Sequence, residues 1–95
     1  MPIVVTVNID SDVAEVERVE RDNPELMAVI GGAARKYMVA HRRTVRAGQV
    51  MDLDEFASEA DYHSFIAEAG EAIKRYGELI GVAPRDTLWS LQAAP

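Results

Sequence analysis

The sequence predicts one α+β domain over residues 1–95, with the element order β-α-β-β-α-β. Three observations predict it: a nearly unbroken apolar run at the start, two stretches with apolar residues at helical spacing, and two extended segments joined at a glycine. A chain of 95 residues can close only one core. Its 48% hydrophobic and 27% charged residues are typical of a folded globular protein.

The first two elements are a strand over 3–9 and a helix that follows Asp12 and runs to about Lys36. The strand is rich in β-branched residues and carries apolar side chains on both faces, which is typical of a central strand. Asp12 is the predicted N-cap, because a glutamate follows three residues later. We expect a break or bend at Asn23-Pro24, because proline cannot continue the hydrogen bonding of a helix interior.

A hairpin is predicted over 38–46 and 49–56, because Gly48 supplies the positive φ that a tight reversal needs. With a two-residue loop, the cross-strand pairs on one face are Val45–Val50, Arg43–Asp52, His41–Asp54 and Val39–Phe56. A three-residue loop with a glycine bulge is the alternative, and it would place His41 opposite Leu53.

The last two elements are a helix that starts from Ser58 and a strand over 86–92. Ser58 is followed by acidic residues in a capping pattern, and an apolar stripe then recurs at helical spacing. Gly81 is expected to end this helix. Right-handed crossovers then produce a four-stranded antiparallel sheet with two helices on one face, which is the ferredoxin-like arrangement.

The sheet is predicted to need cover on its second face as well. Apolar side chains of the first strand point both ways, and a bare apolar sheet face would be an association surface. A second copy of the chain is therefore the expected partner. We expect the polar pairs Arg43–Asp52 and His41–Asp54 to face the cavity between the two copies. The helices are expected to pack on the other face, against the apolar residues Met38, Ala40, Met51 and Leu53.

The charge balance argues against several classes of partner. Ten basic and sixteen acidic residues give a net charge of −6, so nucleic acid and anionic membrane surfaces are not expected to bind. No cysteine is present, and no spacing of histidines or carboxylates predicts a metal site. Without a signal peptide or a long apolar run, the predicted location is the cytoplasm.

The run from Val50 to Tyr62, with His41-Arg42-Arg43 before the turn, resembles the dimeric α/β-barrel superfamily, which includes antibiotic-biosynthesis-monooxygenase-like proteins. The similar element is a third strand that ends in an aromatic residue, then a spacer, a serine-capped acidic turn and an aromatic residue in the second helix. The resemblance implies a homodimer whose sheets face each other and enclose small ligand cavities. It leaves the activity open, because members include cofactor-independent oxygenases, haem-degrading enzymes, dehydratases and proteins of no known role.

A haem-degrading activity is not expected. The first strand is similar to that of the haem-degrading members, and Asn8 matches their functional asparagine. Those members also need a tryptophan and an axial histidine in the second helix, where this chain has Phe65 and Lys74. We therefore predict no cofactor.

The predicted function is binding of a small aromatic or polyketide-like molecule in the sheet cavity, with or without proton transfer or cofactor-independent oxygenation. His41 is the candidate base, Asp54 its orienting partner and Arg43 the group that stabilises an anion. The candidate ligand-binding residues are Asn8, Asp52, Phe56 and Trp89. The alternative is a non-enzymatic ligand-binding or interaction dimer, in which the polar pairs only set strand register.

Overall fold

The computed structural model describes residues 1–93. Its elements are β1 (Ile3–Ile9), α1 (Val13–Asp22), α2 (Pro24–Tyr37), β2 (Met38–Arg46), β3 (Gln49–Phe56), α3 (Glu59–Ile80) and β4 (Arg85–Ser90). The predicted break at Asn23-Pro24 is confirmed, and it is complete, since Pro24 opens a separate helix at a position where its missing N–H costs nothing. The described chain therefore has three helices where two were predicted.

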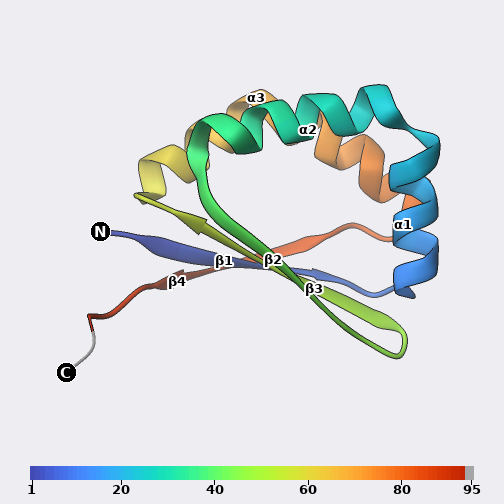
Figure 1. The fold of residues 1–95 in the computed structure, drawn as a ribbon, viewed down its shortest axis with the longest axis horizontal. Coiled ribbons are helices and arrows are strands. Elements are labelled where there is room, and N and C mark those ends of the chain that lie inside the picture. The colour runs from blue at the N-terminus through green and yellow to red at the C-terminus, as the bar shows by residue number, and fades with distance from the viewer. Residues whose placement is uncertain (94–95) are drawn as a thin grey trace.

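The four strands form one antiparallel sheet in the order β2-β3-β1-β4. Figure 1 shows all three helices on one side of this sheet, with α2 and α3 lying across it and α1 standing at one end. No helix of residues 1–93 lies on the other side, and the sheet does not close on itself within one chain. The predicted ferredoxin-like α+β fold is confirmed, with β4 starting and ending slightly earlier than expected.

The hairpin turns through Ala47 and Gly48, and Gly48 has the predicted positive φ, 74°. The predicted pairs Arg43–Asp52 and His41–Asp54 are confirmed. At the start of β2, however, Phe56 pairs with Met38 and not with Val39. A bulge between Met38 and Ala40 adds one residue to β2 there, so the pairing with β3 shifts by one residue.

The ends of α3 are as predicted. The Ser58 hydroxyl accepts a hydrogen bond from the Asp61 backbone N–H at 3.1 Å, and Gly81 ends the helix with a φ of 99°. Asp12 is the N-cap residue of α1, as predicted, but its side chain makes no capping hydrogen bond. Its carboxylate instead accepts the Gly48 backbone N–H at 2.9 Å, so this residue ties the start of α1 to the hairpin turn.

The helices cover the sheet face that was predicted to be open. Val50 is buried beside Val16 of α1, and Phe56 is buried beside Phe65 of α3. Because side chains alternate along a strand, Asp52 and Asp54 point to the same side as these two apolar residues. The polar hairpin residues therefore face the helices, and the prediction that they face a second copy of the chain is wrong.

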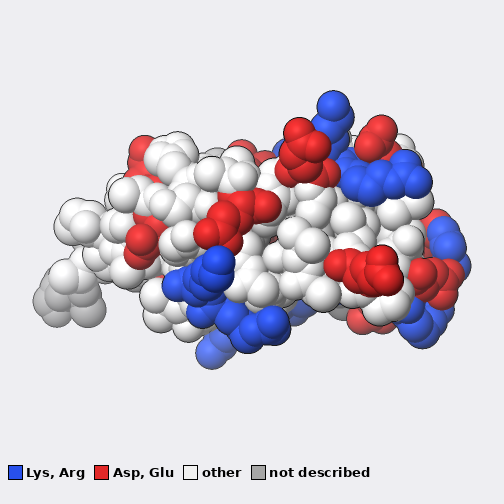
Figure 2. All heavy atoms as spheres, turned by 90° about the horizontal axis from the view of Figure 1, so that it is seen from above, with Lys and Arg blue, Asp and Glu red and all other residues white. Residues whose placement is uncertain are grey.

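The open face carries the alternate side chains of the same strands. Val4, Met51 and Leu53 are half-buried there, so the predicted packing of Met51 and Leu53 against the helices is also wrong. On the opposite side, seen from above the helices in Figure 2, acidic and basic side chains are interspersed with uncharged surface. None of the helices in residues 1–93 has both the length and the apolar composition for crossing a bilayer.

Candidate functional site

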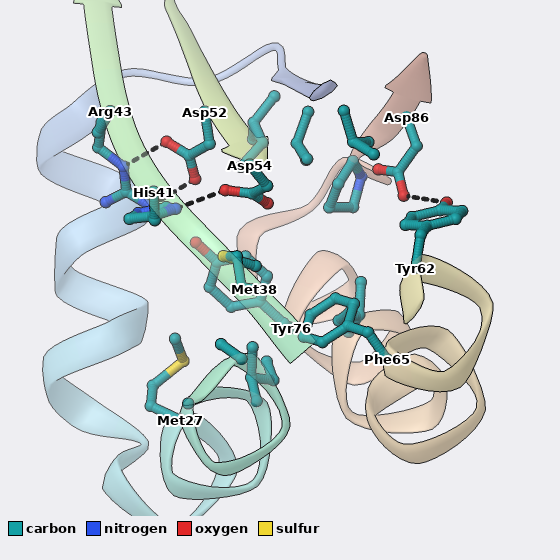
Figure 3. Close-up of a pocket in the computed structure, with 18 of the residues that line it drawn as sticks. Met27, Met38, His41, Arg43, Asp52, Asp54, Tyr62, Phe65, Tyr76 and Asp86 are labelled. Atoms are coloured by element: carbon teal, nitrogen blue, oxygen red, sulfur yellow. Dashed lines mark hydrogen bonds and ion pairs between the residues drawn. The ribbon is translucent and has the colours of Figure 1, made fainter. Parts of the chain in front are cut away.

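A cavity of 320 Å³ lies between the helices and the covered face of the sheet. Its walls are mostly apolar, and their side chains come from β1, β3, α2 and α3: Val5, Ile30, Phe56, Phe65 and Ile73. Polar side chains gather at the end formed by β2 and β3, as Figure 3 shows. The predicted cavity between two sheets thus has a counterpart inside a single chain, because the helices stand far enough from the sheet to leave space.

His41 and Asp54 form a pair at the polar end of the cavity. The Nδ1 atom of His41 lies 2.5 Å from Oδ1 of Asp54, and the two residues face each other across the β2–β3 ladder. The imidazole side chain is 50% exposed, whereas the Asp54 side chain is 12% exposed. Burial raises the pKa of Asp54 above its usual 3.8, although the hydrogen bond and charge of His41 oppose that rise.

Arg43 lies two residues further along β2, and carboxylates occupy most of its guanidinium. It donates to Asp52 from Nε at 2.8 Å and from Nη2 at 3.1 Å. It also donates to Glu20 of α1 from Nη1 at 2.9 Å and from Nη2 at 2.8 Å. These hydrogen bonds, first those to Glu20 and then those to Asp52, raise the pKa of Arg43 far above its already high value. Four of the hydrogen bonds that an arginine can donate are therefore spent inside the protein.

Glu20 also accepts a hydrogen bond from the Tyr76 hydroxyl of α3 at 2.7 Å. Burial alone would raise the pKa of Glu20, but the hydrogen bonds from Arg43 and Tyr76 outweigh it, so the pKa is lowered. Neither Glu20 nor Tyr76 was predicted as a site residue. Tyr76 belongs to the apolar stripe of α3. Glu20 follows the buried Val16 by four residues, and this helical spacing was the signal that places Glu20 on the buried side of α1.

A second tyrosine–carboxylate pair lies on another wall of the cavity. Tyr62 of α3 donates to Asp86 of β4 at 2.7 Å, and both residues line the cavity (Figure 3). Burial, and then the hydrogen bond to Asp86 and its charge, raise the pKa of Tyr62. Asp86 pairs with Val7 across β1 and β4, which places it on the covered face. Sequence reasoning missed this pair because it needs the pairing of strands at opposite ends of the chain.

The predicted site residues divide between the two faces of the sheet. His41, Arg43, Asp52, Asp54 and Phe56 line the cavity. Asn8 and Trp89 do not, because they lie on the open face, where the Trp89 indole donates to the Thr6 hydroxyl at 3.0 Å. Within residues 1–93, no group of three or more histidines and carboxylates is placed to hold a metal ion.

Solved structures of low sequence identity share this fold. The Rv0793 protein of Mycobacterium tuberculosis is 14% identical, with a TM-score of 0.70 over 99% of this chain and 98% of that chain. A putative antibiotic biosynthesis monooxygenase from Deinococcus radiodurans is 12% identical, with a TM-score of 0.68 over 98% of this chain and 95% of that chain. A Streptomyces coelicolor monooxygenase in complex with the ligand nanaomycin D is 17% identical, with a TM-score of 0.65 over 99% of this chain and 88% of that chain.

These likenesses confirm the predicted resemblance to antibiotic-biosynthesis-monooxygenase-like proteins at the level of the fold. No family model and no curated protein matches the sequence. At such identities a shared fold does not assign a reaction, since one fold supports many chemistries.

Proposed function

We propose that the cavity between the helices and the sheet binds a small aromatic molecule, and that His41 with Asp54 accepts a proton from it. The observation that carries the proposal is the position of this hydrogen-bonded pair, 2.5 Å apart, at the polar end of a cavity whose walls are mostly apolar. The cavity volume of 320 Å³ is near the lower end of the range of about 300–1,000 Å³ for small-molecule sites.

The proposed base is the Nε2 atom of His41. A carboxylate at Nδ1 holds the imidazole in the tautomer that carries its proton there, which leaves a lone pair on Nε2. The half-exposed ring can reach a bound molecule, while the buried Asp54 stabilises the imidazolium that forms. The proton donor would be a phenol or a C–H bond activated by a neighbouring carbonyl group.

An oxygenation without a cofactor would follow from the same proton transfer. Dioxygen would react with the carbanion of a methylene group that lies between two aryl rings. The methylene loses two hydrogens and becomes a carbonyl, and the second oxygen atom leaves as water, so no external reductant is needed. The name of the Streptomyces coelicolor neighbour, a monooxygenase, supports considering this reaction here.

The proposed partner is a second copy of the chain, seated on the open sheet face. Half-buried apolar side chains on that face include Val4, Met51 and Leu53, and Trp89 is 57% exposed. Removing such a surface from water favours association, and two-fold pairing is the commonest form of it. Sedimentation equilibrium tests the partner directly, since a mass of one chain at micromolar concentration would contradict it. The cytoplasm remains the predicted location.

A non-enzymatic ligand-binding protein is the second candidate. The observation that favours it is that Arg43 already donates four hydrogen bonds to Glu20 and Asp52. Few donors of this cation are therefore left to stabilise a reacting anion. In this case the cavity would hold its ligand unchanged. The polar pairs would then set the strand register and the polarity of the cavity.

One experiment separates the two candidates. Binding of 1-naphthol is measured by NMR titration, and dioxygen uptake is measured with anthrone, for the wild type and for His41→Gln and His63→Gln. His63 is the control, because it lies on the exposed surface of α3 beside Glu59. We expect His41→Gln to bind 1-naphthol and to lose about 100-fold or more of the uptake rate, and His63→Gln to keep both.

Each other outcome identifies the failing part of the proposal. Binding without any uptake by the wild type would favour the non-enzymatic candidate. Uptake that survives His41→Gln would show that His41 is not the base. Failure of the wild type to bind any of a set of one-ring to three-ring aromatics would refute the proposed function.

A further inference from the structure

The ionisable groups of the cavity are unbalanced in charge. Besides the two tyrosines, the ionisable side chains that line it are four carboxylates, one guanidinium and one imidazole: Glu20, Asp52, Asp54, Asp86, Arg43 and His41. Within the described residues, no lysine lines the cavity, and its one arginine, Arg43, donates four hydrogen bonds to Glu20 and Asp52. Even with His41 protonated, the carboxylates outnumber the cations by two.

Asp54 has an oxygen that is available to a ligand. The residue is 8% exposed, and within residues 1–93 the only hydrogen bond of its side chain joins Oδ1 to Nδ1 of His41. No side-chain oxygen or nitrogen of the described residues is both fully buried and without a partner. The second oxygen of Asp54 therefore touches accessible space, and Asp54 lines the cavity. A buried carboxylate oxygen favours a hydrogen-bond donor, and most of all a cationic one.

Aromatic rings stand beside these carboxylates. Phe56 lies with its ring centroid 5.5 Å from that of Tyr62 and 5.6 Å from that of Phe65, and all three rings line the cavity. The Tyr62 hydroxyl donates to Asp86, which fixes the ring next to that carboxylate (Figure 3). Aromatic faces attract cations, and rings combined with carboxylates are the chemistry by which proteins bind ammonium groups.

We infer that the natural ligand of the cavity is a ring compound that carries a protonated amine, and that aromatic carboxylates are excluded. This inference rests on the proposed function, because it assumes that the cavity binds a ring system. The ammonium group lies between Asp54 and Asp86 and donates to the free oxygen of Asp54, while the ring packs on the apolar walls. An aromatic carboxylate would meet the excess of negative charge, and Arg43 is already hydrogen-bonded to Glu20 and Asp52.

The test uses three probes with the same ring: 1-naphthylmethylamine, 1-naphthylmethanol and 1-naphthoate, which are cationic, neutral and anionic at pH 7. Dissociation constants are measured by NMR titration at low and at moderate salt. We expect the amine to bind at least tenfold more tightly than the alcohol, and the carboxylate to bind at least tenfold more weakly than the alcohol.

Two conservative variants locate the effect. Asp86→Asn and Asp54→Asn keep an oxygen that can accept the hydrogen bonds from Tyr62 and His41, so the fold is retained. Each should weaken binding of the amine at least fivefold, and Asp86→Asn, at the carboxylate that accepts from Tyr62, should leave binding of the alcohol within twofold. The matched control is Glu71→Gln on the exposed surface of α3, which removes the same net charge away from the cavity and should change none of the three constants.

The outcomes distinguish this inference from the proposed function. If the alcohol binds and the carboxylate binds as tightly as the amine, the charge selectivity is refuted and ring binding stands. If Glu71→Gln weakens binding of the amine as much as Asp86→Asn does, the preference for the amine comes from the net charge of the protein, and the inference is refuted. If none of the three probes binds, the proposed function fails and this inference fails with it.

Discussion

Two neighbouring ion pairs on the same pair of strands differ in how many of their donors and acceptors have partners within the protein. Arg43–Asp52 and His41–Asp54 are both cross-strand pairs of β2 and β3, and they lie two residues apart on the same face. Arg43 makes two hydrogen bonds to Asp52 and two more to Glu20, which is itself held by Tyr76. His41 makes one hydrogen bond to Asp54, and its ring is half exposed.

The difference favours a structural role for the Arg43–Asp52 pair, and it leaves the His41–Asp54 pair for the ligand chemistry of the proposed function. The Arg43 network joins α1, β2, β3 and α3, so its energy contributes to keeping α1 on the sheet. The His41–Asp54 pair leaves one imidazole nitrogen and one carboxylate oxygen without protein partners among the described residues. Substitutions in the Arg43 network should therefore change stability, whereas substitutions of His41 should change ligand chemistry.

The largest effect is expected for Arg43→Met. It removes four hydrogen bonds and leaves two mostly buried carboxylates, Glu20 and Asp52, without their cation. We expect the free energy of unfolding in urea to fall by about 3 kcal/mol. The control is Arg18→Met, whose exposed partners Glu15 and Asp22 lie on the surface of α1, with an expected loss below about 1 kcal/mol. Equal losses in the two variants would contradict the structural role of Arg43.

Tyr76→Phe should produce the next largest effect. The variant keeps the buried ring and removes only the hydroxyl that donates to Glu20. A loss of about 1.5 kcal/mol in the free energy of unfolding is expected, the lower end for a hydrogen bond to a charged group, because Glu20 keeps its donors from Arg43. Tyr37→Phe is the comparison, because its hydroxyl donates to the more exposed Glu68 and should matter less.

The two networks should also respond to pH in opposite directions. The lowered pKa of Glu20 means that its contribution is present above the usual value near 4.5 and is lost as pH falls through the lower folded value. The raised pKa of Asp54 means that stability falls as pH rises from 3.8 through the higher folded value. Urea unfolding from pH 3 to 7 should show that Glu20→Gln removes the first dependence and that Asp54→Asn removes the second. Parallel profiles for the two variants would contradict the assignment.

The smallest effect on stability is expected for His41→Gln. The imidazole is half exposed and makes a single hydrogen bond, so the free energy of unfolding should change by no more than about 0.5 kcal/mol. Chemical denaturation checks this directly. A loss as large as that of Arg43→Met would show that the His41–Asp54 pair holds the fold, and the contrast between the two pairs would disappear.

The strand pairing behind this contrast was predictable from local signals. A two-residue turn ending in Gly48 determines the register of β2 against β3, and this register places His41 opposite Asp54. The single error, the predicted Val39–Phe56 pair, arose because a bulge beyond Ala40 leaves no mark in the hydrophobic pattern. The side of the sheet that these pairs occupy was predicted wrongly, because β3 alternates Asp52 and Asp54 with the apolar Met51 and Leu53.

By itself, the sequence determined the order of the strands and of the helical regions between them, the interruption at Pro24, the ends of α3 and most of the pairing within the hairpin. These features depend on residues a few positions apart, where backbone preferences and turn geometry act directly. Only the tertiary structure decided which sheet face the helices cover, that Glu20 and Tyr76 complete the bonding of Arg43, and that a cavity remains beside Asp54. Those outcomes depend on how helices and sheet pack across the whole chain, where contacts form between residues that no local pattern connects.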